Sequence, residues 1–168
     1  AHLRPTSDRV RESIFNLLIN GGYGDPITGA RVLDLFAGTG ALGLEAISRG
    51  AARATFVDDG AAARALLRRN IELTRTGEVT TALRSNATRM GAAPDGGYGL
   101  VFLDPPYGKG LGEAALISCL AGGWIAPEAL IVWEEGTPPA IPPAFDLLDQ
   151  RRYGCLLYTS DAADDMQC

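Results

Sequence analysis

A glycine-rich turn between an apolar segment and a helix constrains the fold more than any other feature of this sequence. Residues 32–40 read VLDLFAGTG, and the next residues, ALGLEAISR, have the composition of a helix. Gly38 and Gly40 allow the backbone to turn sharply and to approach a bound molecule closely. With Gly43 they form the pattern G-x-G-x-x-G, which is typical of nucleotide-binding folds when a strand precedes it and a helix follows.

The rest of the chain alternates short apolar segments with amphipathic ones. Helices are expected after an entry segment within 4–20, where Thr6 or Ser7 is the cap, and over 41–49, 61–74 and 112–120. Strands are expected over 31–36, 54–58, 79–84, 99–104 and 129–134, and a later strand begins within 145–153. Strands that are apolar along their length, alternating with helices, predict one α/β domain with a mostly parallel, doubly wound sheet.

Composition excludes several classes of protein. The cysteines are Cys119, Cys155 and Cys168, and His2 is the only histidine, so we expect neither a structural zinc site nor a disulfide framework. No apolar run approaches the ~20 residues that cross a bilayer, and no secretory leader is recognisable. These features favour a cytoplasmic enzyme without a metal. The net charge of −5 is unusual for a protein that binds RNA, although arginines cluster near the start of the chain.

An acidic residue at the end of the first expected strand selects among nucleotide-like cofactors. Asp34 lies beside the turn where the pyrophosphate of NAD would bind. A carboxylate near such a dianion is repelled by about 1–4 kcal/mol at about 4 Å. S-adenosylmethionine has no phosphate and carries a sulfonium and an ammonium group, so the same carboxylate attracts it. The sequence therefore favours S-adenosylmethionine, and the alternative role of Asp34 is to cap the following helix.

Other residues at the carboxyl ends of the expected strands complete a cofactor site. Asp58 ends the second strand and can accept hydrogen bonds from a ribose diol. Asn86 and Ala87 follow the third strand and are expected beside the adenine ring, although a structural role fits this pair equally well. The turn itself supplies the remaining cofactor-binding residues: Phe36, Ala37, Gly38, Thr39 and Gly40.

The segment VFLDPPY at 101–107 is the most informative about chemistry. Pro105 and Pro106 stiffen a loop at the carboxyl end of a strand, where open α/β sheets bind ligands. An exocyclic base amine is a poor nucleophile, and two acceptors, the Asp104 carboxylate and the Pro105 carbonyl, would favour its pyramidal transition state. Tyr107 would stack on a flipped-out base. We therefore expect catalytic roles for Asp104, Pro105, Pro106 and Tyr107.

With these motifs in place, the chain resembles the RsmD family, bacterial methyltransferases that modify guanine N2 in 16S ribosomal RNA. The resemblance covers about residues 3–154 and rests on RPTSDRVRESIFN at 4–16, DLFAGTGALGLEA at 34–46 and DPPY at 104–107. The first block separates this family from other DPPY enzymes, including adenine-N6 methyltransferases. The resemblance implies a Rossmann-like, class I S-adenosylmethionine-dependent methyltransferase fold, with a seven-stranded sheet whose last strand is antiparallel.

The resemblance also implies a substrate and the residues that bind it. The substrate would be 16S rRNA, free or in the 30S particle, and the enzyme a monomer that contacts RNA through Arg4, Thr6, Arg9 and Arg11. Without the resemblance, these arginines would be interpreted as solvated charges on a helix. The acid that ends the second strand is usually Glu in this family, and Asp58 is the shorter equivalent. An adenine-N6 methyltransferase and an NAD-dependent oxidoreductase remain the alternative functions.

The end of the chain differs in character from the rest. Residues 155–168 read CLLYTSDAADDMQC, which is similar to a translated transposase sequencing-library adapter. We therefore place the methyltransferase domain at 1–154 and expect 155–168 to be a non-native tail. The family's short basic segment before the first block is also absent, so the domain is expected to be truncated at both ends. Residues 156–159 are β-prone and could mimic the missing last strand.

Overall fold

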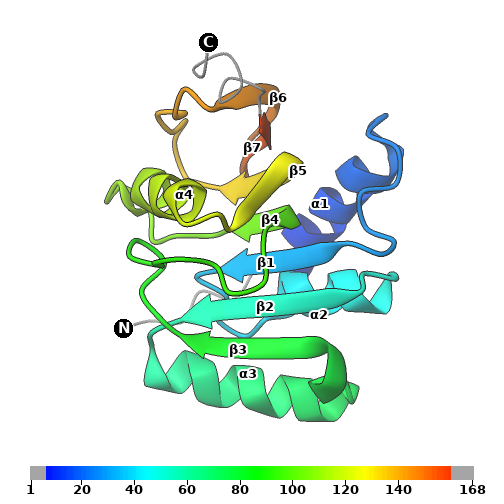
Figure 1. Cartoon of the computed structure of the whole chain (residues 1–168). Coiled ribbons are helices and arrows are strands. Elements are labelled where there is room, and N and C mark those ends of the chain that lie inside the picture. The colour runs from blue at the N-terminus through cyan, green and yellow to red at the C-terminus, as the bar shows by residue number, and fades with distance from the viewer. Residues whose placement is uncertain (1–6, 160–168) are drawn as a thin grey trace.

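The computed structural model describes residues 7–159, which form a seven-stranded sheet with helices on both faces (Figure 1). The strands are β1 (Arg31–Leu35), β2 (Arg53–Asp58), β3 (Thr80–Arg84), β4 (Tyr98–Leu103), β5 (Ile125–Glu134), β6 (Phe145–Arg151) and β7 (Gly154–Thr159). The helices are α1 (Asp8–Asn20), α2 (Ala41–Ser48), α3 (Ala61–Thr74) and α4 (Leu111–Ala121), with a 3₁₀ turn, η1 (Gly77–Val79).

The strand order is β3-β2-β1-β4-β5-β7-β6. The pairs β3-β2, β2-β1, β1-β4 and β4-β5 are parallel, whereas β7 runs antiparallel to both β5 and β6. The chain reverses its direction of winding between β1 and β4, and open α/β sheets bind ligands at such a point. The mostly parallel sheet and the antiparallel last strand were both predicted and are confirmed.

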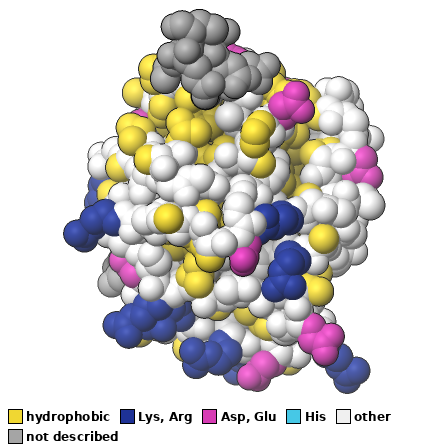
Figure 2. All heavy atoms as spheres, in the orientation of Figure 1, with side chains coloured by type: hydrophobic (Ala, Val, Ile, Leu, Met, Phe, Trp, Pro, Cys, Tyr) yellow, Lys and Arg dark blue, Asp and Glu magenta, His cyan; other side chains and the backbone are white. Residues whose placement is uncertain are grey.

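Each face of the sheet supports its own hydrophobic core because side chains alternate along every strand. One core joins α4 to residues such as Val101 and Trp133, and the other joins α1, α2 and α3 to residues such as Phe56 and Phe102. Trp124 and Trp133 are both buried in the first of these cores. Figure 2 shows Lys and Arg side chains gathered over the lower part of the visible face, where α3 lies, and hydrophobic ones over the upper part near β6 and β7.

Several predicted strand boundaries differ from the structure, and two of the differences have identifiable reasons. The first strand ends at Leu35 and not at Phe36, because Phe36 has a left-handed backbone with φ of 56° and cannot continue the ladder. The fifth strand begins at Ile125, four residues before the apolar run over 129–134 that predicts it. Ile125 pairs with Tyr98, and the register then shifts, so Pro127 and Glu128 interrupt the apolar pattern without ending the strand.

The sheet continues past residue 154, the predicted end of the native domain, into the segment that was predicted to be β-prone. Residues Gly154–Thr159 form β7, and Leu156 and Leu157 are buried on opposite faces of the sheet. The β-prone, apolar character of this segment lets it fill the position between β5 and β6. The foreign origin of 155–168 stays a prediction, and residues beyond 159 lie outside the described part of the chain.

Candidate cofactor and catalytic site

Four carboxylates lie at the carboxyl ends of four neighbouring strands. Asp34 is in β1, Asp58 ends β2, and Glu134 ends β5, whereas Asp104 directly follows β4. Leu35 pairs with Val57 on one side and with Leu103 on the other, and Leu103 pairs with Trp133. This register places the acids side by side along one edge of the sheet. Asp34, Asp58 and Asp104, predicted separately from the sequence, are thus brought together.

Hydrogen bonds fix the glycine turn that follows β1. The Asp58 carboxylate accepts hydrogen bonds from the backbone N–H of Gly38 at 2.9 Å and from that of Gly60 at 2.8 Å. Asn70 of α3 donates from Nδ2 to the carbonyl oxygen of Thr39 at 2.9 Å. The turn is therefore held by β2 and α3 before any ligand binds. The roles of Gly60 and Asn70 were missed, because nothing in their spacing signals contact with a turn far away in sequence.

Glycine is required at two positions of this turn by close packing. A Cβ atom at Gly40 would collide with Leu67 of α3, and φ at Gly40 is 81°. A Cβ atom at Gly43 would collide with the ring of Phe56 and lie 3.1 Å from Oδ2 of Asp34. The third glycine of the motif therefore allows α2 to approach β1 and β2 closely, as in other folds with this motif.

Backbone strain marks the first residue of the turn. Phe36 adopts a left-handed conformation, which costs a non-glycine residue about 1–2 kcal/mol. Such conformations persist where the surrounding structure enforces them, and they concentrate at ligand sites. Here the adjacent Ala37 N–H donates to the Val57 carbonyl oxygen at 3.0 Å, which ties the turn to β2.

Asp34 is 2% exposed and accepts a hydrogen bond from the backbone N–H of Gly43 at 3.0 Å. Burial raises the pKa of its carboxyl group well above the usual value, and the Gly43 N–H opposes this rise. The nearby carboxylates of Asp104, Glu134 and Asp58 raise the pKa further. The geometry also agrees with a capping role, because Gly43 lies in the first turn of α2. The Asp34 side chain can therefore cap α2 and also attract a cationic ligand. Such a ligand would stabilise the negatively charged form of its carboxyl group.

The predicted adenine-contacting pair lies just beyond β3. Oδ1 of Asn86 accepts hydrogen bonds from the N–H and the hydroxyl of Thr88, at 2.9 and 2.7 Å. Ala87 is buried in the core beneath α4. The local turn thus occupies the side-chain oxygen of Asn86 but leaves its amide N–H groups for other acceptors. Contact with adenine stays a prediction for both residues.

The DPPY loop joins β4 to α4 at the same edge of the sheet. Asp104 is half-buried, and its N–H lies 3.4 Å from the carbonyl oxygen of Leu35, which ties the loop to the end of β1. Pro105 is buried and Pro106 half-buried, whereas the side chain of Tyr107 is 50% exposed. The exposed ring at a stiff loop has the accessibility that base stacking requires.

The loop that follows β5 lies against the DPPY loop, and no motif in the sequence predicts this contact. A Cβ atom at Gly136 would lie 2.9 Å from Cδ2 of Tyr107, so only glycine lets the ring approach this backbone. Glu135 is 8% exposed, and burial raises the pKa of its carboxyl group. The Trp133 indole and the backbone N–H groups of Gly108 and Gly136 face this carboxylate and lower the pKa. Glu135 thus lies close to Gly108, on the loop that carries Tyr107.

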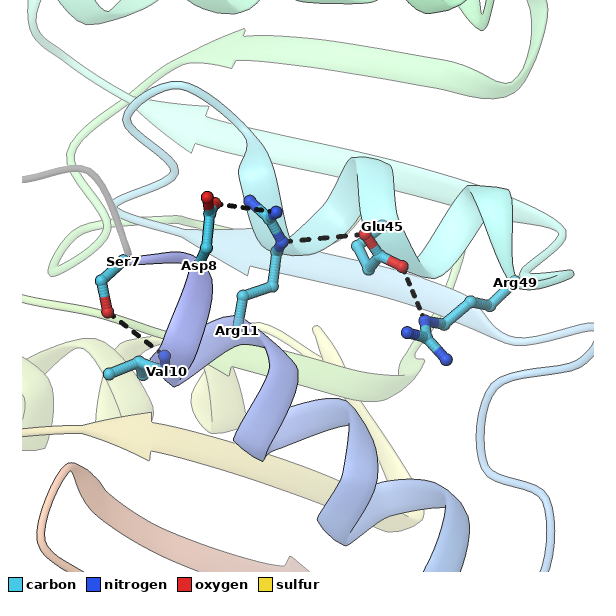
Figure 3. A network of polar contacts seen from close by, with 6 residues as sticks. All are labelled: Ser7, Asp8, Val10, Arg11, Glu45 and Arg49. Carbon is cyan, nitrogen blue, oxygen red and sulfur yellow. Dashed lines mark hydrogen bonds and ion pairs between the residues drawn. The ribbon is translucent and has the colours of Figure 1, made fainter.

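The arginines predicted to bind RNA occupy different surroundings. Arg4 and Thr6 lie outside the described residues, and Arg9 is exposed on α1. Arg11 pairs with Asp8 at 2.9 Å and lies 3.7 Å from Oε1 of Glu45, which joins α1 to α2 (Figure 3). Glu45 also pairs with Arg49 at 2.7 Å. The Arg11 guanidinium is thus partly neutralised, and RNA contact stays a prediction for all four residues.

Ser7 caps α1, since its hydroxyl oxygen accepts a hydrogen bond from the Val10 N–H at 3.2 Å (Figure 3). Thr6 or Ser7 was predicted to cap this helix, and Ser7 does so; Thr6 lies outside the described residues. Within residues 7–159, no group of three or more His, Cys, Asp and Glu side chains is arranged to hold a metal ion. In the same range, no helix combines the length and the apolar character needed to cross a bilayer.

A family model, a curated protein and a solved structure each resemble this chain over most of its length. The model of the family described as "Conserved hypothetical protein 95" matches residues 1–160. Ribosomal RNA small subunit methyltransferase D of Escherichia coli is 39% identical over 159 residues, which are 93% of this chain and 77% of that protein. The solved structure of the putative methyltransferase yhhF from Escherichia coli superposes with a TM-score of 0.78 at 37% identity, over 94% of this chain and 88% of that one.

A more distant structure defines the fold class. An RNA methyltransferase from Salinibacter ruber, solved with S-adenosyl-L-homocysteine, superposes with a TM-score of 0.66 at 13% identity, over 94% of this chain and 92% of that one. At this identity the likeness concerns the fold alone. It confirms the predicted Rossmann-like α/β fold of S-adenosylmethionine-dependent methyltransferases.

Proposed function

The chain belongs to the RsmD family, and from this premise we propose that it transfers a methyl group from S-adenosylmethionine to the N2 amine of a guanine in 16S ribosomal RNA. The observation that carries the proposal is the arrangement of acids and the DPPY loop along one edge of the sheet. Asp34 and Asp58 belong to the expected cofactor side, and Asp104 with Tyr107 to the expected base side. We further propose that the protein acts as a cytoplasmic monomer without a metal.

The residues around the glycine turn fit S-adenosylmethionine better than a dinucleotide. A buried carboxylate at Asp34, with three further carboxylates nearby, disfavours a pyrophosphate and favours a cationic ligand. Asp58 would accept hydrogen bonds from the ribose hydroxyls while it holds the Gly38 and Gly60 N–H groups. When bound, S-adenosylmethionine supplies an electrophilic methyl group on a positively charged sulfur. The remaining chemistry belongs to side chains and backbone of this chain.

Asp104 and Pro105 would prepare the amine. The Asp104 carboxylate and the Pro105 carbonyl oxygen accept hydrogen bonds from its two N–H groups, which draws the nitrogen lone pair out of conjugation with the ring. Tyr107 stacks on the face of the flipped base and holds it in line with the methyl donor. No strong base is needed before transfer, because the amine becomes acidic only after it is methylated.

Two other functions make different demands on the same residues. An adenine-N6 methyltransferase would use the DPPY loop in the same way, so the choice of guanine rests on the family and on the block at 4–16. In an NAD-dependent oxidoreductase, the Asp34 carboxylate would repel the pyrophosphate of the cofactor. A thermal unfolding series with S-adenosylmethionine, S-adenosylhomocysteine and NADH separates these two cofactor classes. We expect the first two to raise the midpoint and NADH to leave it unchanged, since a ligand at about 100 times its Kd adds about 2.7 kcal/mol.

Activity is tested by transfer of a labelled methyl group from S-adenosylmethionine to unmodified 16S rRNA or 30S particles. We expect the wild type to label one of these substrates and Asp104→Ala to abolish labelling. Asp95→Ala, the same substitution at an exposed acid in the loop before β4, provides the matched control and keeps activity. Full activity in Asp104→Ala would refute the role given to the DPPY loop.

A further inference from the structure

Three connections converge at the sheet edge that carries Asp104. They are the DPPY loop after β4, the segment after β5 and the turn between β6 and β7. Glu134 at the end of β5 pairs with Gly154, and Gly154 pairs with Arg151 at the end of β6. The N–H of Glu135 donates to the carbonyl oxygen of Tyr153 at 2.9 Å, which ties the second connection to the third. β6 lies three strand spacings from β4, and neighbouring strands are about 4.8 Å apart, so Arg151 lies roughly 14 Å from the end of β4 in the plane of the sheet.

A cavity of about 250 Å³ opens between the second and third connections. Its walls are formed by residues 135–139 of one connection and by residues 150–152 and Gly154 of the other. Gly136 belongs to this wall and also lies against the ring of Tyr107. The cavity and the ring of Tyr107 therefore share Gly136 as a neighbour, which places the cavity next to the loop where the target base is proposed to stack.

Two arginines line the cavity, and they differ in whether an acidic side chain pairs with their charge. Arg151 forms a two-bond ion pair with Asp149, from Nε at 2.9 Å and from Nη2 at 3.0 Å, which fixes the orientation of its guanidinium. Arg152 is exposed and has no ion-pair partner within residues 7–159. Lys109 is likewise exposed, on the loop that carries Tyr107. Among the residues that line the cavity, Arg152 therefore carries a positive charge that no acid of residues 7–159 pairs with, and the buried Glu135 is the one carboxylate.

We propose that this cavity binds the backbone phosphate of a nucleotide next to the target base, with Arg152 as the phosphate ligand. The inference rests on the proposed function, since it assumes a strand of RNA that delivers one base to Tyr107. A guanidinium matches a phosphate through two parallel hydrogen bonds, and a contact of this kind fixes the position of a strand without reading its sequence. Arg152 thus positions the RNA, and the DPPY loop performs the chemistry.

Binding of a fluorescein-labelled single-stranded RNA, followed by anisotropy over a range of salt concentrations, tests the site. A phosphate contact on a single strand contributes about −0.7 to the slope of log K against log salt. Loss of one contact in Arg152→Ala is therefore expected to flatten the slope by about 0.7 and to weaken binding about fivefold near 0.1 M salt. Arg152→Lys, which keeps the charge, retains most of the slope.

The matched control is Arg53→Ala, which removes an exposed arginine at the opposite edge of the sheet, where β2 begins. We expect it to bind RNA like the wild type. An unchanged slope in Arg152→Ala, or an equal loss in Arg53→Ala, would overturn the proposal. Wild-type protein that binds RNA but transfers no methyl group would refute the proposed function instead, so the two failures are distinguishable.

Discussion

The replacement Asp34→Asn separates folding from cofactor binding. Asn has nearly the shape of Asp, and its side-chain oxygen keeps an acceptor for the Gly43 N–H that donates at 3.0 Å. The substitution removes only the negative charge, which is 2% exposed and lies near three other carboxylates. Because the folded protein disfavours this charge, we expect the free energy of unfolding without ligand to remain the same or to increase.

Binding of S-adenosylmethionine should change in the opposite direction. A hydrogen bond to a charged group contributes about 1.5–3 kcal/mol, which corresponds to a Kd about 10- to 150-fold higher when the charge is lost. S-adenosylhomocysteine lacks the sulfonium charge but keeps the ammonium group, so its Kd should increase by a smaller factor. Titration calorimetry measures both constants, and urea unfolding of the same samples measures stability.

Asp95→Asn is the matched control, since it makes the same chemical change at an exposed position. It should leave both cofactor constants and the unfolding free energy unchanged. Binding of S-adenosylmethionine by Asp34→Asn as tight as by the wild type would contradict the proposed role of the Asp34 charge. This role is also refuted if the unliganded variant loses stability by several kcal/mol, because the carboxylate would then be needed for folding and not for the cofactor.

Three further predictions follow from the same geometry. Gly43→Ala places a Cβ atom against Phe56 and should reduce the free energy of unfolding by about 1–3 kcal/mol, measured in urea, with Gly99→Ala as an unhindered glycine for comparison. Tyr107→Ala should raise the KM for RNA about 5- to 150-fold with little change in stability, because the ring is half exposed, and Tyr107→Phe should restore most of the affinity. The raised pKa of Asp34 predicts that its contribution to the stability of the unliganded protein is lost as pH rises above the usual aspartate range through the raised value, whereas cofactor affinity rises over the same interval. Thermal unfolding across pH tests this, and an equal pH slope in Asp34→Asn would contradict it.

The fold was predictable where local pattern and tertiary context agree. Buried parallel strands such as β4 are apolar along their length, and the glycine turn has a spacing that few other structures use. The ends of strands were predicted wrongly where the backbone conformation does not follow the apolar pattern of the sequence. Phe36 is apolar and would extend β1 in sequence, but its left-handed conformation ends the strand there. Pro127 and the charged Glu128 interrupt the apolar pattern and conceal the first half of β5.

The candidate site divides in a similar way. Asp34, Asp58 and Asp104 are visible in the sequence because each lies where an apolar strand ends, and strand ends meet at one edge of a parallel sheet. The partners that hold the site do not share such a rule. Asn70 reaches the turn from the middle of α3, and Glu135 reaches the DPPY loop from beyond β5. Such contacts depend on helix position and loop path, which no local pattern encodes.

The most direct test of the central claim is to identify the methylated nucleoside. Small-subunit rRNA that lacks the modification is incubated with the protein and S-adenosylmethionine, then digested to nucleosides and analysed by mass spectrometry. We expect N2-methylguanosine with the wild type and none with Asp104→Ala. N6-methyladenosine in its place would contradict the proposed base. Absence of any methylated nucleoside, in protein whose unfolding midpoint rises with S-adenosylmethionine, would contradict the proposed substrate.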